Sequence, residues 1–312
     1  MRCGSTWLYE MLKHHPEILM SEIKEVDFFF MKRMMRHDLN WYEDLFKSRD
    51  RHELKPVRGE ISPGYARLKN WQVRQIARLL PNLRILLTLR HPIDRLWSQT
   101  VYTFGHLRGR DVRSVGSLEL VRQLERARSK LSSDYIRMLK VWTGAFGHEA
   151  VHISFFNDLC STPEKFVNEV LKHIGASVPW SLPEELSKTK VWSTNSLVRH
   201  EQEIPDVVHW YMADQLLEPT EQLNDFLEGR VSDWVEELRS LAGRTRLNWR
   251  ILREVNQKLL SVPESLAYES YHAFLDAKMW LRWSRLRRSY KGSRSFAASP
   301  TSGQLEAYPN ET

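Results

Sequence analysis

The stretch LRILLTLRHPIDRLWSQ, residues 83–99, decides the fold class of this 312-residue chain. The apolar run at residues 85–87 predicts a strand that is buried on both faces of a parallel sheet. Arg90 leaves this strand at its carboxyl end, and Pro92 opens a helix, where its missing N–H group costs nothing. A buried strand that passes directly into a helix is typical of an α/β fold.

Further strands and helices alternate around this stretch. Helices are predicted from about Ser5 to before Pro16, over 40–46, 70–81, 93–104, 134–146 and 163–175, and from about Pro205 onward; short strands are predicted within 56–65 and 150–156. We therefore predict one α/β domain over 1–290, with a P-loop-like parallel sheet, helices on both faces and a helical C-terminal part. Residues 291–312 are rich in Ser, Gly, Ala and Pro and are predicted to be a disordered tail.

Composition favours a globular protein with an acidic ligand. The chain is 42% hydrophobic and 27% charged, with a formal net charge of +7 and a pI of about 9.3. Its two cysteines, Cys3 and Cys160, form no disulfide framework, so a reduced compartment is the default. We find neither an apolar run of about 20 residues nor a signal-peptide pattern, and the cytoplasm is the simplest location.

The opening turn RCGSTW, residues 2–7, predicts an anion-binding site. Gly4 lets a ligand approach the backbone closely. The N–H groups of residues 5–7 begin a helix without backbone partners, at the positive end of the helix dipole. The hydroxyls of Ser5 and Thr6 and the charge of Arg2 complete a site that suits a phosphate or a phosphosulfate. The alternative is an ordinary Ser/Thr N-cap, and the turn alone does not separate the two.

Neighbouring residues narrow the kind of anion. A nucleotide-triphosphatase loop has the pattern Gly-x-x-x-x-Gly-Lys-Ser/Thr, whereas this turn is shorter and contains no lysine. Such enzymes also hold magnesium with an Asp at a strand end, where this chain has Arg90. A cysteine phosphatase would have an arginine six residues after its cysteine, and the residue six positions after Cys3 is Tyr9. We interpret Cys3 as a small loop residue rather than a nucleophile.

A second anion subsite is predicted at Arg90 and Ser98. Ser98 lies eight positions after Arg90, about two helical turns further on. A guanidinium fork and a hydroxyl suit a phosphate group. The alternative is an arginine that caps the strand end and a serine on a helix face. Together with the opening turn, the pair indicates a ligand with two separate anionic ends.

Four motifs in order carry a resemblance to a known family. They are RCGSTWLYEMLKHHPEI (2–18), KEVDFFF (24–30), GEISPGY (59–65) and LRHPIDRLWSQ (89–99). In this order they resemble the sulfotransferases that use 3'-phosphoadenosine 5'-phosphosulfate, with most similarity to the heparan sulfate and related bacterial branch. The resemblance covers the first half of the chain well and continues through SDYIRMLKVWTGAF (133–146) and ISFFNDLCSTPEKFVNEVLKHIG (153–175).

The resemblance implies a role for each motif. The turn formed by Arg2, Cys3, Gly4, Ser5, Thr6 and Trp7 would hold the 5'-phosphosulfate, and Arg90 and Ser98 would hold the 3'-phosphate. Glu25 would be the general base, because a transferring sulfuryl group needs an acceptor relieved of its proton. Arg2 would offset charge on the leaving phosphate.

Other residues are assigned to the substrate or the core. Lys24, Glu60 and Tyr135 are candidate substrate contacts, and Trp142 is predicted to lie in the core. The loop with Lys188, Lys190 and Asn195 would close over the adenosine. Two departures from the family pattern stand out: Arg2 replaces the usual lysine, which changes its geometry, and Ile61 occupies a position where relatives often carry a lysine.

The function predicted from the sequence is sulfuryl transfer to a hydroxyl or amine, with 3'-phosphoadenosine 5'-phosphate as the product. No metal is expected, and the sequence does not identify the acceptor, for which a carbohydrate or a small metabolite is a candidate. One alternative is a truncated or degenerate family member that binds the nucleotide without turnover, because in this fold a buried strand feeds the turn. We expect the chain to begin upstream; otherwise the sheet lacks its central first strand.

The other alternative is a basic glycan- or nucleic-acid-binding protein. The segment KMWLRWSRLRRSYKGSR (278–294) is basic with interleaved tryptophans. We interpret it as a terminal helix packed on the domain, with contact to a membrane face as a less favoured interpretation. No nucleic-acid partner is expected.

Overall fold

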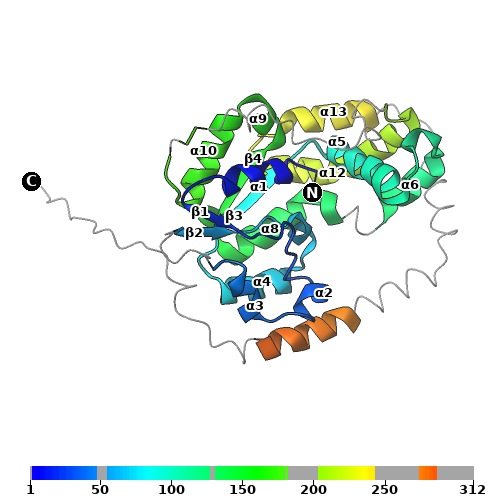
Figure 1. The fold of residues 1–312 in the computed structure, drawn as a ribbon. Coiled ribbons are helices and arrows are strands. Elements are labelled where there is room, and N and C mark those ends of the chain that lie inside the picture. The colour runs from blue at the N-terminus through cyan, green and yellow to red at the C-terminus, as the bar shows by residue number, and fades with distance from the viewer. Residues whose placement is uncertain are drawn as a thin grey trace, which may run out of the picture.

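Two pairs of parallel strands lie at the centre of the computed structural model, which describes residues 2–47, 55–126, 131–178, 180–181, 203–242 and 274–286 (Figure 1). Strand β1 (Ile18–Met20) pairs with β2 (Val57–Gly59), and β3 (Ile85–Leu89) pairs with β4 (Val151–Phe155). Both pairs are parallel and are flanked by helices. The predicted α/β class is therefore confirmed.

The arrangement of the strands differs in two ways from the sequence prediction. The sequence predicts one parallel sheet, whereas the described residues form two sheets of two strands each. The predicted burial of β3 on both faces is only partial: Leu89 is fully buried and residues 85–88 are half-buried, with Ile85 and Leu87 packed against one hydrophobic cluster and Leu86 against another. Within the described part of the chain, β3 has one hydrogen-bonded neighbour, β4.

Most of the longer helices form where the apolar spacing predicts them. Their bounds are α1 (Ser5–Lys13), α2 (Met31–Met34), α3 (Leu39–Asp44), α4 (Asn70–Leu79), α5 (Pro92–Tyr102), α6 (Ser117–Glu125), α8 (Tyr135–Phe146), α9 (Phe156–Ser161), α10 (Pro163–Ile174), α12 (Asp206–Phe226) and α13 (Ser232–Ala242), with a further helix over 274–286. Short helical turns join them at Pro63–Arg67, Thr103–Leu107, Val112–Ser114 and His148–Ala150. The sequence did not predict β1, α2, α6 or α9. β1 has only three residues, too few to show an alternating pattern.

Local signals explain where several helices begin and end. Pro92 and Pro163 occupy the first positions of α5 and α10. The Asp134 side chain caps α8 by accepting a hydrogen bond from the Arg137 N–H. Gly175 ends α10 in the left-handed conformation. These signals fix α5 and α8 beside β3 and β4, where the candidate site lies.

Three hydrophobic clusters hold the elements together. The largest lies between α3, α4, α8 and helix 274–286 and contains Trp142, as predicted. The second joins α5, α6 and α12, and the third packs α1 and β1 against α10. The helical pattern predicted from Pro205 is confirmed over α12 and α13.

Some predictions fall on other parts of the chain. The loop with Lys188, Lys190 and Asn195 and the tail over 291–312 lie outside the described residues. Among the helices of the described ranges, none combines the length and apolar character needed to cross a membrane.

Candidate functional site

The opening turn presents the start of α1 without a side-chain cap. The cap position is Gly4, in the left-handed conformation with φ of 81°, so Ser5 and Thr6 lie inside the first turn. The first helical hydrogen bond runs from the Leu8 N–H to the Gly4 carbonyl, at 3.0 Å. An ordinary Ser/Thr N-cap is thereby excluded, and the N–H groups of residues 5–7 have no helical partner. Trp7 is buried beside Phe166, so it offers the site its backbone only.

Glycine is required at the cap by both conformation and space. A Cβ atom at Gly4 would lie 2.6 Å from Cδ1 of Leu159, on α9. The turn therefore packs directly against α9, and the positive φ of Gly4 would strain any other residue. This packing gives Gly4 a structural role, and the close approach of a ligand to its backbone stays a prediction.

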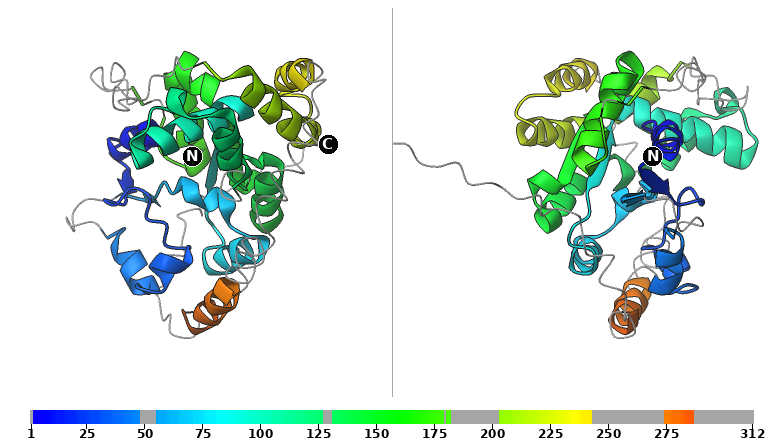
Figure 2. Two further views of the ribbon diagram at one scale, coloured as in Figure 1. Left: turned by 90° about the vertical axis from the view of Figure 1, so that its right-hand side faces the viewer. Right: turned by 60° about the vertical axis from the view of Figure 1, so that its left-hand side comes forward.

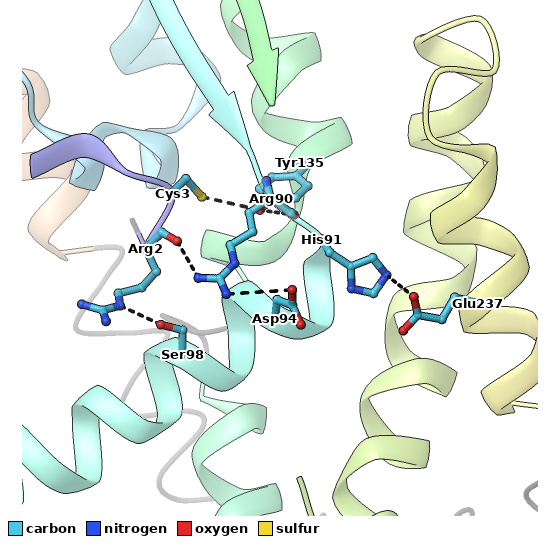
Figure 3. A network of polar contacts seen from close by, with 8 residues as sticks. All are labelled: Arg2, Cys3, Arg90, His91, Asp94, Ser98, Tyr135 and Glu237. Carbon is cyan, nitrogen blue, oxygen red and sulfur yellow. Dashed lines mark hydrogen bonds and ion pairs between the residues drawn. The ribbon is translucent and has the colours of Figure 1, made fainter. Parts of the chain in front are cut away.

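Arg2, Arg90 and Ser98 meet in front of this turn (Figure 3). Arg2 Nε donates a hydrogen bond of 3.0 Å to Ser98 Oγ, and Arg90 Nη1 donates one of 3.4 Å to the Arg2 carbonyl. Arg90 follows the carboxyl end of β3, and Ser98 lies on α5 with Arg2 bonded to both residues. The two predicted anion subsites are therefore adjacent and joined through Arg2.

Two aromatic rings that the sequence analysis did not single out orient these guanidinium groups. Arg2 lies over the Tyr102 ring at 5.1 Å, and Arg90 lies over the Phe156 ring at 4.7 Å. The sequence offered a signal for both. Tyr102 follows Ser98 by one helical turn, and Phe156 comes directly after β4, at the same sheet edge as Arg90.

The Tyr135 hydroxyl contacts both the opening turn and the backbone at the carboxyl end of β3. Its hydroxyl donates 2.9 Å to the Arg90 carbonyl, accepts from the Arg90 N–H at 3.3 Å and lies 3.9 Å from Cys3 Sγ. Tyr135 and Cys3 are both buried. Burial raises the pKa of Tyr135 well above its usual value. The structure places Tyr135 where it fixes backbone geometry. We call Arg2, Cys3, Arg90, Ser98 and Tyr135 the cationic cluster.

The cationic cluster carries more positive charge than its neighbours balance. The Asp94 carboxylate lies 3.9 Å from Arg90 Nη2, and the Asp94 side chain is 56% exposed, against 15% for Arg90. Burial and, next, the charge of Arg90 lower the pKa of Arg2. On the neighbouring side, His91 lies 3.6 Å from Glu237, and burial lowers the pKa of His91. Two close arginines with a weak counter-charge form an electrostatic site for an anion.

A second group of charged residues lies on the loop after β1. Lys24 Nζ and Glu25 Oε1 are 2.9 Å apart, and the Glu25 side chain is 47% exposed. The loop is held by its backbone: the Glu25 N–H donates 3.2 Å to the Ile61 carbonyl, and the Asp27 N–H donates 3.0 Å to Ser62 Oγ. Glu25 is therefore positioned while its carboxylate faces solvent.

Backbone strain is concentrated at the candidate site. Among the described residues other than glycine, positive φ occurs at Arg2 (63°), Glu25 (58°), Asp27 (49°) and Glu228 (54°). The first three belong to the opening turn and the loop after β1. Such conformations cost about 1–3 kcal/mol each and persist where the surroundings enforce them, often at functional sites.

Glu60 lies beneath this loop in a network of hydroxyl groups. It accepts hydrogen bonds from Tyr42 at 2.7 Å, from Tyr65 at 3.0 Å and from Ser62. Burial raises the pKa of Glu60, and the three hydroxyl donors oppose that rise. These contacts give Glu60 a structural place. We call Lys24, Glu25, Asp27 and Glu60 the carboxylate cluster.

Helix α1 connects the two clusters. The cationic cluster surrounds its N-terminus, and the Tyr9 hydroxyl on α1 donates 2.6 Å to the Ser21 carbonyl, where the loop after β1 begins. Within the described ranges, no group of three or more His, Cys, Asp or Glu side chains forms a potential metal site. The arrangement can hold an anion with two charged ends at the start of α1 and present the Glu25 carboxylate from the loop after β1.

Comparisons with known proteins find a matching family model, a similar crystal structure and a similar curated protein. A family model described as "Sulfotransferase domain" matches residues 1–243. The crystal structure of a sulfotransferase from Alicyclobacillus acidocaldarius is similar with a TM-score of 0.57 and 21% identity, covering 75% of this chain and 94% of that one. The membrane-associated sulfotransferase kil1 of Dictyostelium discoideum is 29% identical over 108 residues, which make up 35% of this chain and 22% of that protein.

Proposed function

This chain belongs to the sulfotransferase domain family, and we propose that it transfers a sulfuryl group from 3'-phosphoadenosine 5'-phosphosulfate to a hydroxyl or amine. One observation carries the proposal: two guanidinium groups, a serine hydroxyl and an uncapped helix start converge beside β3. Such a site suits a ligand with two anionic ends. Carbohydrates and small metabolites are the acceptors to test first.

We propose that the two ends of the donor divide the cationic cluster between them. The 5'-phosphosulfate would lie on the N–H groups of residues 5–7, with the hydroxyls of Ser5 and Thr6 and the charge of Arg2. The 3'-phosphate would lie on Arg90 and Ser98. Tyr135 and Cys3 would act as positioning residues, because both are buried and their side-chain contacts fix the backbone of the turn and of Arg90.

The proposed reaction is an in-line displacement at sulfur. The acceptor oxygen or nitrogen forms a bond to sulfur while the bond from sulfur to the 5'-phosphate oxygen breaks. Glu25 takes the acceptor's proton, and Arg2 and the helix N–H groups stabilise the charge that grows on the leaving phosphate. The products are the sulfated acceptor and 3'-phosphoadenosine 5'-phosphate. Lys24, paired with Glu25, would contact the acceptor or hold the carboxylate in place.

Two measurements test this proposal separately. Calorimetry with 3'-phosphoadenosine 5'-phosphate tests the binding site, and absence of binding at high micromolar ligand would exclude a nucleotide-binding role. Turnover is tested with labelled donor and a panel of acceptors. Binding without turnover across that panel would favour a nucleotide-binding protein over an enzyme.

Substitution of Glu25 tests the assignment of the base. Glu25→Gln keeps the size of the side chain and removes its basicity, so we expect kcat to fall about 10²–10⁴-fold while the nucleotide Kd is unchanged. Glu22→Gln, on the same loop and exposed, is the matched control and should keep full activity. Near-normal turnover in Glu25→Gln would show that another group takes the proton.

A further inference from the structure

Helix 274–286 has two apolar faces, of which the structure covers one. Met279, Trp283 and Leu286 are buried against the largest hydrophobic cluster. Trp283 stacks on Phe29 with ring centroids 5.8 Å apart and planes 7° apart. Figure 2 shows this helix, in orange, at the edge of the molecule beside the blue segment that includes α2 and α3. Its inner face is therefore a well-packed docking surface on the domain.

The outer face carries large apolar side chains in water. Phe274, Trp280 and Leu281 are 54%, 58% and 50% exposed. Phe274 and Leu281 are seven residues apart and so share one side of the helix. Trp280 lies toward α4, where it lines a shallow pocket with Arg78. Phe274 and Leu281 are therefore the apolar side chains of the outer face, and neighbouring exposed apolar side chains mark a binding surface more than single ones do.

Cations border this apolar face. Lys278 and Arg285 are exposed and, by helical spacing, lie on the same side as Phe274; Lys278 Nζ is 4.5 Å from the Phe274 ring centroid. Asp276, the one acidic residue of this helix, is paired with Lys69. In the sequence, residues 277–305 contain seven lysines and arginines and no acidic residue.

We propose that the outer face of helix 274–286 binds the surface of an anionic lipid bilayer. Phe274 and Leu281 would enter the boundary between headgroups and acyl chains, while Lys278 and Arg285 would contact lipid phosphates. An acidic polymer would match the charges but leave the apolar side chains in water. A second copy of the chain would bring the same cations together, which disfavours pairing through this face.

Vesicle flotation of the full chain tests the proposal. We expect binding to vesicles of phosphatidylcholine with about 30% phosphatidylserine, weakened by salt, and little binding to phosphatidylcholine alone. Equal binding to both vesicles, or none to the anionic ones, would overturn the proposal. Measurement of molar mass in solution separates a membrane surface from a dimer interface. A dimer that forms through this face would also overturn it.

Variants at exposed positions locate the surface without disturbing the fold. Phe274→Ser with Leu281→Ser is expected to lower the affinity for anionic vesicles by about tenfold or more, because it removes the inserted apolar area. Lys278→Glu with Arg285→Glu is expected to lower it by a similar factor. The matched control is Leu107→Ser with Leu118→Ser, which changes exposed leucines elsewhere. If the control variant lost as much affinity as the others, this helix would not be the binding surface.

Discussion

The cationic cluster and the carboxylate cluster are built in opposite ways. In the cationic cluster, side chains hold one another: Arg2 bonds Ser98, Arg90 bonds the Arg2 backbone, and aromatic rings support both guanidinium groups. In the carboxylate cluster, backbone hydrogen bonds fix the loop and leave the Glu25 carboxylate toward solvent. The difference fits two tasks. A site for a ligand of fixed charge gains from rigid, buried donors, whereas a proton acceptor must reach a second substrate.

Among the variants that test this difference between the two clusters, Arg90→Ala has the largest expected effect. Removing a buried guanidinium that would contact phosphate should raise the Kd of 3'-phosphoadenosine 5'-phosphate about 100-fold, or about 2.7 kcal/mol. Calorimetry measures it, with Arg74→Ala on the exposed side of α4 as the control. If Glu25→Gln weakened nucleotide binding as strongly as Arg90→Ala, the division of tasks between the two clusters would be wrong.

A smaller effect, on stability, is expected from Tyr42→Phe. The change removes the 2.7 Å hydrogen bond to Glu60 and should lower the free energy of unfolding by about 1.5–3 kcal/mol, since the acceptor is a buried carboxylate. Urea denaturation measures it. Tyr102→Phe keeps the ring over Arg2 and serves as the control. A loss of nucleotide affinity in Tyr42→Phe, with stability unchanged, would mean that the two clusters are not separate.

The smallest expected effect is a pH dependence beside the cationic cluster. Burial lowers the pKa of His91, although Glu237, Asp94 and Asp233 oppose this. An unfolded histidine titrates near about pH 6.5, so the stability that neutral His91 contributes is present above that pH. It is lost as the pH falls through the folded pKa. Thermal unfolding at pH 7.5 and 5.5 should show a smaller acid loss in His91→Gln than in the parent, and equal losses would contradict the assignment.

The sequence predicted the parts of the molecule that depend on local pattern. The strand at 85–89, the helix after Pro92 and the turn at Gly4 each carry a local signal, and the structure has all three. The α/β class followed from the alternation of strands and helices, and the family followed from the order of the motifs. The site residues Arg2, Arg90 and Ser98 were chosen from the sequence, and the structure brings them together.

The sequence did not predict what depends on contacts between distant segments. The bridge between Arg2 and Ser98 spans 96 positions, and the Tyr135 hydroxyl reaches Arg90 from 45 positions away. Neither partner choice has a local signal. The three-residue strand β1 forms because β2 pairs with it, and the division into two small sheets likewise depends on long-range pairing.

Because Glu25 has a positive φ, replacing it with glycine is expected to raise the stability of the fold and to lower the activity. At 58°, this position suits Gly or Asn better than Glu, so Glu25→Gly would relieve strain while removing the proposed base. Variants selected for heat resistance alone are therefore expected to replace Glu25 and to be inactive. In the proposed chemistry, activity requires at this position a side chain that the backbone conformation disfavours.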